Sequence, residues 1–483
     1  MVSRKDFHQI DEYLWEVPKG ARGDMLVPAR LYADNELLEA TFDDRSAEQL
    51  INTATLPGIV NYALAMPDIH QGYGFPIGGV VATRLPQGVI SPGGVGYDIN
   101  CGVRLLTSRL EEDEIKPHLE PLMNALYHDV PSGVGKGHAK AMGGRDLDQI
   151  LERGASWAVA QGFGTEEDLT HTEEQGTMKG GDAGAVSARA KNRAGDQLGT
   201  LGSGNHFLEI DVVEQVFDPD IADRFGLAEG QVVVWIHSGS RGLGHQVCTD
   251  AVRELQTASA RYGIRLPDRE LACAPFDSPE GRRYFAAMVC AANFAWANRQ
   301  MMTHLARLAF ERVLAGKVRN VNLTLLYDVA HNIAKIEEHM VDGERVKVCV
   351  HRKGATRAFG PRLQEVPSAF RDIGQPVLIP GSMGTGSYVL VGTEKAMQAS
   401  FGSTCHGAGR VLSRHAAKRA VGGQQMQQVL AREGIVVRAG SMGELAEEAP
   451  EAYKDVDRVV KVVHQAGLAR RVARTRPIGV MKG

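Results

Sequence analysis

Clusters of glycine alternate with helix-like stretches along this chain, and no clear linker separates them. Glycine accounts for 55 of the 483 residues, about 11% where about 7% is usual. The excess is grouped rather than periodic, which argues against a collagen-like repeat and against a flexible linker. Because glycine lets the backbone approach a ligand closely, we expect several sites that are lined by backbone.

Length and composition predict a large globular body. At about 150 residues per domain, a chain of 483 residues has room for about three domains. No internal boundary is visible, however, and we expect one intertwined body over residues 1–483. With 43% hydrophobic and 23% charged residues, the chain can bury a sizeable core. The predicted fold class is α+β, with mixed sheets flanked by helices.

The net charge of −4 excludes a protein that binds nucleic acid through bulk positive charge, but it is compatible with a local basic groove. The first ten residues lack the apolar segment of a signal peptide. No run of about 18 apolar residues predicts a membrane span. The six cysteines are widely spaced without a C-x-x-C pair, which argues against a disulfide framework or a zinc knuckle. We therefore expect a cytoplasmic protein.

Local patterns predict a few individual elements. We expect helices over 47–65, 110–128, 281–317 and 408–433, and strands over 77–83, 232–236 and 377–379. Residues 172–196 are rich in glycine and polar side chains, and they are predicted to form a mobile surface loop.

Asp98 and Cys101 lie three residues apart in a glycine-rich segment, Ser91-Pro-Gly-Gly-Val-Gly-Tyr-Asp-Ile-Asn-Cys-Gly102. One turn of chain can aim both side chains at a single point, and a carboxylate with a thiolate suits a borderline divalent metal. The alternative, a turn aspartate beside a buried cysteine, stays open.

Three histidines follow or end apolar segments: His206, His237 and His331. Rigid scaffolds place metal ligands at such positions, although each histidine alone is also compatible with a structural role. Together with Asp98 and Cys101 they make five candidate ligands, which is enough for two ions if the thiolate bridges them.

His406 precedes three small residues and Arg410. Small residues let a phosphate approach the main chain, and an arginine can bind it with two hydrogen bonds. A histidine there can act as a nucleophile toward phosphorus, or simply cap a helix. The loop Pro380-Gly-Ser-Met-Gly-Thr-Gly-Ser387 is a second phosphate-type loop without Walker spacing. Lys482 lies in an apolar stretch, 476–483, that we expect to be packed against the body.

Taken together, these segments resemble the RtcB family of RNA-splicing and repair ligases. The matching blocks span nearly the whole chain and include Pro67-Asp-Ile-His70, Gly96-Tyr-Asp-Ile-Asn-Cys-Gly102, Gly204-Asn-His-Phe207, His237-Ser-Gly-Ser-Arg241, Asp328-Val-Ala-His-Asn332, His351-Arg-Lys-Gly-Ala-Thr356, Pro380-Gly-Ser-Met383, His406-Gly-Ala-Gly-Arg410 and Val480-Met-Lys-Gly483.

The resemblance implies a ligase that depends on GTP and two manganese ions. Such an enzyme joins an RNA 3′-phosphate or 2′,3′-cyclic phosphate to a 5′-hydroxyl, as in tRNA halves, and often works with a small partner called archease. The Irving–Williams order favours zinc or copper on an Asp/Cys/His site, so manganese rests on the resemblance alone.

The resemblance also implies roles for individual residues. Asp98, Cys101 and His206 would hold one ion, and Cys101, His237 and His331 would hold the other. His406 would be the nucleophile that takes GMP from GTP. The nucleotide pocket would be formed by Asn205, His206, Phe207, Leu208, Glu209, His331, Asn332, Pro380, Gly381, Ser382, Met383, Ser387, His406, Gly407, Ala408, Gly409, Tyr453 and Lys482. Asp68 matches a further family position. Independently of the resemblance, the Lys482 ammonium could donate to the guanine acceptors O6 and N7 and Glu209 could accept from the donors N1 and N2, so that together they would select guanine over adenine.

Two other functions are compatible with parts of the pattern. A dinuclear metal phosphoesterase, with His406 as a general acid and no covalent step, explains the ligands but not the glycine loops or Lys482. A non-catalytic RNA-binding protein fits less well, because the chain is acidic and lacks basic-aromatic RNA motifs.

Overall fold

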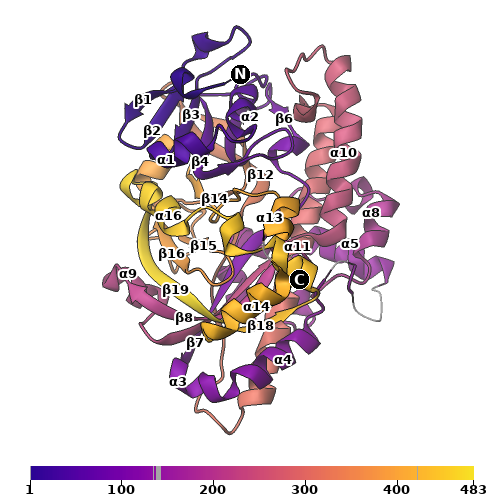
Figure 1. The fold of residues 1–483 in the computed structure, drawn as a ribbon. Helices are drawn as coiled ribbons and strands as arrows, with labels where there is room; N and C mark the ends of the chain where they lie inside the picture. Colours follow the sequence, from indigo (N-terminus) through magenta and orange to yellow (C-terminus); the bar gives the residue numbers. More distant parts are fainter. Residues whose placement is uncertain (1, 134, 138–142, 421) are drawn as a thin grey trace.

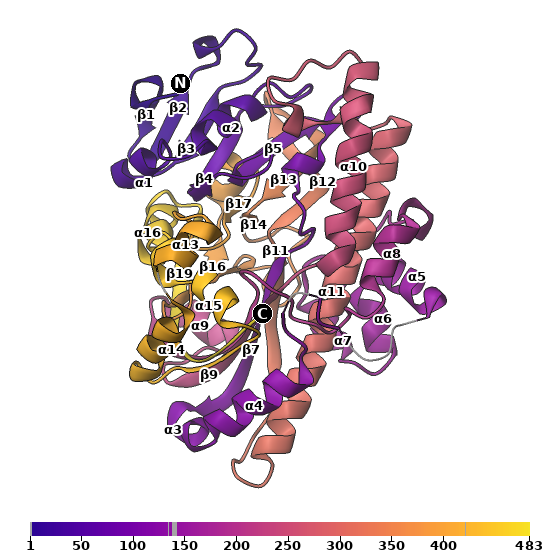
Figure 2. The same ribbon diagram turned by 45° about the vertical axis from the view of Figure 1, so that its right-hand side comes forward.

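The computed structural model describes residues 2–133, 135–137, 143–420 and 422–483, and in these ranges two large sheets lie one above the other (Figure 1). Two long helices, α10 (Arg241–Arg261) and α11 (Pro279–Leu314), run along one side of both sheets (Figure 2). The predicted mixed α+β class is confirmed.

The first sheet combines the N-terminal segment with a hairpin from much later in the chain. Its strands are, in spatial order, β1 (His8–Asp11), β2 (Leu14–Val17), β3 (Ala29–Tyr32), β4 (Ala63–His70), β5 (Ile77–Arg84), β13 (Glu344–Lys353) and β12 (Asn332–Val341). All neighbours in this sheet are antiparallel except β3 and β4.

The second sheet carries most of the residues that the sequence predicts for the site. Its strands are, in spatial order, β11 (Thr324–Ala330), β7 (Gly102–Glu111), β9 (Gln231–Ser238), β8 (Phe207–Val216), β19 (Ala469–Lys482), β16 (Ser387–Gly392) and β15 (Pro376–Ile379), with β18 (Val436–Ala439) parallel to β19. Two small ribbons, β6 (Val89–Ile90) with β10 (Ala274–Pro275) and β14 (Ala355–Arg357) with β17 (Ser403–Cys405), complete the described sheets.

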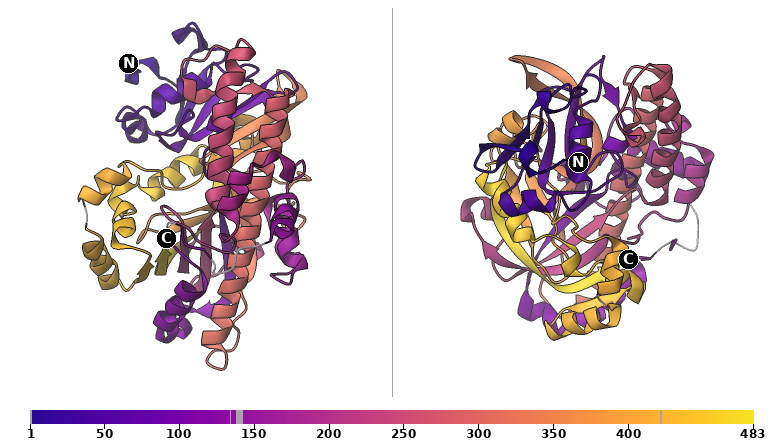
Figure 3. Two further views of the ribbon diagram at one scale, coloured as in Figure 1. Left: turned by 90° about the vertical axis from the view of Figure 1, so that its right-hand side faces the viewer. Right: turned by 45° about the horizontal axis from the view of Figure 1, so that its top comes forward.

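The remaining α-helices surround this framework (Figure 3). They are α1 (Asn35–Ala40), α2 (Ser46–Thr53), α3 (Glu112–Ile115), α4 (Leu119–Asp129), α5 (Gly144–Arg153), α6 (Ala155–Ala160), α7 (Glu166–Thr170), α8 (Ala188–Ala194), α9 (Pro219–Phe225), α12 (Glu394–Ala399), α13 (Arg414–Ala420), α14 (Gly423–Arg432), α15 (Met442–Glu447) and α16 (Val456–Gln465). None of the helices in the described ranges is both long and apolar enough to cross a membrane.

His331 marks the point where the chain passes from one sheet to the other. β11 ends at Ala330 on the edge of the second sheet, and β12 begins at Asn332 on the edge of the first. A histidine at this junction is held from both sides by strand hydrogen bonds, so its side chain has a well-defined position between the two sheets.

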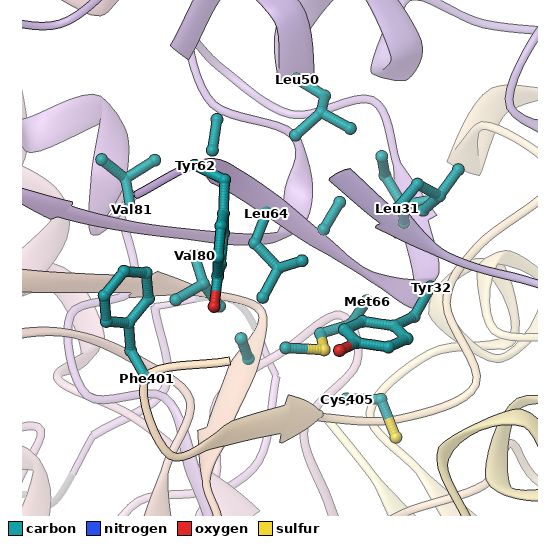
Figure 4. Packing of buried hydrophobic residues seen from close by; sticks show 14 of the residues in the cluster. Leu31, Tyr32, Leu50, Tyr62, Leu64, Met66, Val80, Val81, Phe401 and Cys405 are labelled. Atoms are coloured by element: carbon teal, nitrogen blue, oxygen red, sulfur yellow. The ribbon is translucent and has the colours of Figure 1, made fainter. Parts of the chain in front are cut away.

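Side chains of β4 and of the segment before His406 pack together in one apolar core. Figure 4 shows Tyr62, Leu64 and Met66 packed near Phe401 and Cys405. The rings of Tyr62 and Phe401 lie 5.4 Å apart between centroids, and Cys405 is fully buried at the end of β17. Because close packing restricts movement, the backbone before His406 is firmly anchored.

The three predicted strands are confirmed as β5, β9 and β15, and the helix predicted over 281–317 is confirmed as α11. Ser278 caps α11 by accepting from the amide of Gly281, and Pro279 occupies its first turn, where a missing N–H costs nothing. The helix predicted over 110–128 is confirmed from Glu112 onward, with a tighter turn at Lys116–His118.

Two helix predictions are wrong in extent. The helix predicted over 47–65 ends at Thr53, and β4 begins at Ala63. Pro57 disfavours helical backbone at the residue before it, and Gly58 has a left-handed φ of 76°. The helix predicted over 408–433 is instead irregular up to Ser413, followed by α13 and α14; residue 421 of that prediction lies outside the described residues.

The prediction of a mobile surface loop over 172–196 is wrong in part: many of its residues are exposed, but the segment is not an irregular loop. This segment contains tight turns and α8, and Glu173 at its start is buried. Glu173 accepts hydrogen bonds from the amide of Ala330 at 2.7 Å and from Lys335 Nζ at 2.7 Å. Sequence patterns suggested solvent exposure because glycine and charge dominate locally, whereas Glu173 is buried in ion pairs with Lys335 and Arg357, far along the chain.

Replacement of Glu173 is expected to destabilise the protein strongly. Glu173→Ala removes the acceptor of the Ala330 amide and one partner of the buried ammonium of Lys335, a loss that should cost about 3–5 kcal/mol. Thermal and chemical denaturation should both show a lowered midpoint. Glu166→Ala, an exposed glutamate on α7, should change stability by less than about 0.5 kcal/mol. Equal midpoints for the two variants would contradict this role of Glu173.

Candidate active site

Strand register brings three candidate ligands together at one end of the second sheet. Gly102 pairs with Ser238 on β9 and with Ala330 on β11. Cys101 precedes Gly102, His237 precedes Ser238, and His331 follows Ala330. The three side chains therefore meet where β7 begins and where β9 and β11 end.

His206 and Asp98 complete a second group beside the first. Phe207 pairs with His237, which places His206 next to it at the start of β8. The Nε2 atom of His206 lies 2.8 Å from Asp98 Oδ2 and 3.4 Å from Cys101 Sγ. The Nδ1 atom of His206 lies 3.0 Å from the carbonyl of Leu201, an arrangement that leaves Nε2 free to bind a cation.

These residues form two groups that fit metal ions. Cys101, His237 and His331 form one, and Asp98, Cys101 and His206 form the other, with the candidate ligand atoms in each within 4.8 Å of one another. His237 Nε2 lies 3.2 Å from Cys101 Sγ and 3.3 Å from His331 Nε2. Nitrogen, sulfur and carboxylate ligands in this arrangement suit a transition-metal ion, and Cys101 is common to both groups.

Burial sets the protonation of this cluster. It lowers the pKa of His237 and of His331 well below the ordinary range, and neighbouring positive groups lower both further. Both rings are therefore neutral, the form that binds a metal. Burial opposes ionisation of Asp98, yet His206 outweighs it and lowers the pKa of this carboxyl to about 2. Burial and Asp98 raise the pKa of the Cys101 thiol, so a bound cation is required to favour its thiolate.

His406 lies beside the metal-binding groups and is oriented by Asp68. Asp68 Oδ2 accepts from His406 Nδ1 at 2.6 Å and from its backbone amide at 2.9 Å. Asp68 is fully buried, and although burial opposes ionisation, His406 lowers the pKa of this carboxyl below its ordinary value. With Nδ1 held by Asp68, Nε2 is the nitrogen left for the cavity. The His406 ring lies 4.9 Å from that of His331.

Gly409 allows the chain after His406 to turn back against Asp68. Its φ is 76°, and a Cβ at this position would lie 2.3 Å from the Asp68 carbonyl oxygen. Any other residue would therefore push this loop away from the residue that orients His406.

A cavity of about 350 Å³ joins the metal-binding groups to His406. Of the residues predicted for the site, those on its wall are Asp98, Cys101, Asn205, Phe207, His237, His331, Asn332, Pro380, Gly381, Ser382, Met383, His406, Gly407, Ala408, Gly409, Tyr453 and Lys482. The cations on the wall are Lys353, Arg410, Arg414 and Lys482, so a locally basic cavity exists in a chain of net negative charge.

Four predicted residues are not part of the described cavity wall: His206, Leu208, Glu209 and Ser387. His206 belongs to the metal-binding group. Glu209 is buried in β8, where burial and Asp211 raise the pKa of its carboxyl well above the ordinary value. Ser387 Oγ accepts from the amide of Gly381 at 3.0 Å and so stabilises the loop 380–387. Leu208 is fully buried in the core.

The sequence predicted that Arg410 can bind phosphate, but the structure shows its guanidinium bound to other protein groups. Its guanidinium donates to Glu448 Oε1 at 3.1 Å, to the Tyr453 hydroxyl at 3.0 Å and to the carbonyls of Leu412 and Glu447. Every nitrogen of this side chain therefore already has a protein partner, and Arg410 holds the cavity wall together.

Lys482 reaches the cavity because β19 pairs with β8. Lys482 lies opposite Phe207 in the register, with its Nζ 5.3 Å from the centre of the Phe207 ring and 3.2 Å from the Asn205 carbonyl. The expected packing of residues 476–483 against the body is confirmed, since 476–482 form the last part of β19 and Gly483 is buried.

Several wall residues were not predicted, notably Glu448, Arg414, Tyr73 and Tyr97. Glu448 Oε2 lies 3.9 Å from Lys482 Nζ. No local pattern distinguishes Glu448 or Arg414 from ordinary helical surface residues. Tyr97 adjoins Asp98, so its neighbourhood could have drawn attention to it.

The family model described as tRNA-splicing ligase RtcB matches residues 49–483. The chain belongs to the RtcB family. The tRNA-splicing ligase RtcB of Thermococcus kodakarensis is 57% identical over 475 residues, which cover 98% of each chain. That of Archaeoglobus fulgidus is 56% identical with the same coverage. The RNA-splicing ligase RtcB of Mycobacterium bovis is 53% identical over 90% of this chain and 100% of its own.

The part matched by the RtcB model contains both metal-binding groups, Asp68, His406 and Lys482. The strands β1 to β3 precede the matched part. The resemblance to the RtcB family stated from sequence is thus confirmed.

Proposed function

We propose that this protein is an RNA ligase that uses GTP and two Mn²⁺ ions to join an RNA 3′-phosphate or 2′,3′-cyclic phosphate end to a 5′-hydroxyl end. The observation that carries the proposal is that His406, whose Nδ1 lies 2.6 Å from Asp68, shares one cavity with ligands of both metal-binding groups. Membership of a family whose curated relatives are called tRNA-splicing ligases supports RNA as the substrate.

In this proposal His406 is the nucleophile that accepts GMP. Nε2 of the neutral ring attacks the α-phosphorus of GTP, and pyrophosphate leaves. The ring then carries a positive charge, which the Asp68 carboxylate at Nδ1 stabilises. Asp68 also fixes the tautomer, because an acceptor at Nδ1 keeps the proton there and leaves the lone pair at Nε2.

The cavity wall supplies charge for the triphosphate and the RNA ends. Lys353, Arg414 and Lys482 bring positive charge to the wall; burial lowers the pKa of Lys353 to about 8. Two metal ions, when bound by Asp98, Cys101 and the three histidines, would neutralise phosphate oxygens and polarise the attacked phosphorus.

In this proposal the later steps use the same cavity. A 2′,3′-cyclic phosphate end is first opened by water to the 3′-phosphate. An RNA 3′-phosphate oxygen then attacks the phosphorus of the GMP on His406, which frees the imidazole and activates the RNA end. The 5′-hydroxyl of the second strand then attacks this activated 3′-phosphate, and GMP leaves. Within this proposal tRNA halves are the expected substrates, archease is a candidate partner and the cytoplasm is the expected location.

A labelling experiment tests the proposal. The protein is incubated with Mn²⁺ and GTP labelled at the α-phosphate, denatured and separated on a gel. Label that stays on the protein, is lost in acid and is stable in base indicates a phosphoramidate on histidine. A metal phosphoesterase or a non-catalytic RNA-binding protein would retain no label, and that result would overturn the proposal.

Removal of the Lys482 ammonium is expected to impair guanylylation. Lys482→Ala should reduce the rate of label transfer from GTP by about 10- to 100-fold, the loss typical of a hydrogen bond from a charged group. Metal content and the circular dichroism spectrum should be unchanged, because Lys482 belongs to neither metal-binding group. Lys461→Ala, an exposed lysine on α16, is the control. Labelling of Lys482→Ala at the rate of the unchanged protein would show that nucleotide binding does not depend on this side chain.

A further inference from the structure

Arg299, in the middle of α11, has a fully buried guanidinium that uses all of its hydrogen-bond donors. Nε and Nη2 donate to the two carboxylate oxygens of Asp328, each at 2.8 Å. Nη1 donates to the carbonyl oxygens of Asn100 at 2.8 Å and of Ser238 at 2.9 Å. Nη2 also donates to the side-chain oxygen of Asn100 at 3.1 Å.

Each of these acceptors adjoins a strand end that carries a candidate metal ligand. Asn100 directly precedes Cys101, and Ser238 directly follows His237. Asp328 lies on β11, which ends just before His331. One rigid side chain thus ties together the ends of β7, β9 and β11, which lie next to α11 (Figure 2).

The backbone at Gly102 and Asn100 leaves room for the Arg299 guanidinium. A Cβ at Gly102 would lie 2.9 Å from Arg299 Nη2, so only glycine leaves room for it at the start of β7. Asn100 has a left-handed φ of 51°, which turns both its carbonyl and its side-chain oxygen toward Arg299.

We propose that Arg299 is a positioning residue that sets the distances between Cys101, His237 and His331, and thereby the affinity of the site for divalent metal ions. The inference rests on the proposed function in so far as metal ions occupy this site. Metal ligands must be held to within about 0.5 Å, and the planar guanidinium fixes three chain segments at once, which a single-point ammonium cannot do.

Arg104 on β7 offers a closely matched control. It is also fully buried, and its Nε donates to the same Asp328 carboxylate at 2.8 Å. Its other donors contact the side chains of Gln300, Thr303 and Thr172 rather than the carbonyls beside the metal ligands. Lysine at either position keeps the positive charge next to Asp328 but lacks the planar set of N–H donors of the guanidinium.

The experiment compares Arg299→Lys and Arg104→Lys in the full chain. Binding of Mn²⁺ is measured by calorimetry, the Co²⁺-loaded protein is examined for its thiolate charge-transfer absorption, and thermal midpoints are recorded in chelator. Arg299→Lys is expected to weaken Mn²⁺ binding by about 10- to 100-fold, as for other residues that orient ligands, and to shift the Co²⁺ band. Arg104→Lys is expected to lower the thermal midpoint comparably but to weaken binding by less than about threefold.

An unchanged Mn²⁺ affinity in Arg299→Lys, or an equal loss in both variants, overturns the positioning role while leaving the proposed function intact. If the unchanged protein binds neither Mn²⁺ nor Co²⁺, the metal-dependent function fails and this inference fails with it. If Arg299→Lys does not fold, Asn100→Gly serves instead, because glycine accepts the left-handed backbone and removes one acceptor of Arg299. Weaker Mn²⁺ binding in Asn100→Gly supports the role, and unchanged binding overturns it.

Discussion

His406→Ala is expected to bind metal ions and GTP but to form no guanylylated protein and to join no RNA ends. The substitution removes the nitrogen that faces the cavity while leaving both metal-binding groups intact. Loss of a covalent nucleophile should lower the rate of ligation by about 10⁴-fold or more. The rate is measured with labelled RNA ends, and the adduct with GTP labelled at the α-phosphate.

Two further measurements make the His406 prediction specific. RNA supplied with a 3′-guanylylated end should still be joined by His406→Ala, because that step requires the metal-binding groups but not the imidazole. His128→Ala, an exposed histidine on α4, should behave like the unchanged protein. Formation of the adduct by His406→Ala would assign the nucleophile to another residue.

Cys101→Ser should lose most of its bound metal. The cysteine is the one residue shared by the two metal-binding groups found among the described residues. A serine hydroxyl is rarely ionised, so it lacks the negative charge that a thiolate supplies to two cations. We expect Mn²⁺ binding to weaken by at least about 100-fold, beyond the loss caused by residues that merely orient ligands. Ligation should fall accordingly.

Metal content by mass spectrometry and Mn²⁺ affinity by calorimetry check this second prediction. Cys290→Ser is the matched control, because Cys290 is also fully buried but packs in α11 within an apolar cluster. Two retained ions together with full activity in Cys101→Ser would show that the cysteine is only a packing residue.

Residues that act within a short stretch of chain were the most predictable. The spacing of Asp98 and Cys101 and the small residues after His406 indicated metal and phosphate chemistry without knowledge of the fold. The long helix α11 was also predictable, because its period continues without interruption over many turns. Such features depend on residues that are close together in the sequence, so the sequence alone shows them.

Residues that act through distant partners were not predictable. Glu173 appeared to lie in a mobile surface loop, yet it is buried against Lys335 and the amide of Ala330. Arg410 appeared free to bind phosphate, yet Glu448 and Tyr453 occupy its guanidinium. Each of these partners lies far along the chain, and local composition carries no information about it.

The sequence by itself therefore determined the chemical inventory: five candidate ligands, a histidine followed by glycines, and an apolar segment that carries a lysine. Only the tertiary structure decided how these residues meet. Cys101 and His237 lie 136 positions apart, and they come within 3.2 Å because β7 and β9 pair in one register that the core and the guanidinium of Arg299 maintain. A shift of that register by one residue would turn every side chain to the opposite face and would leave the same inventory without a site.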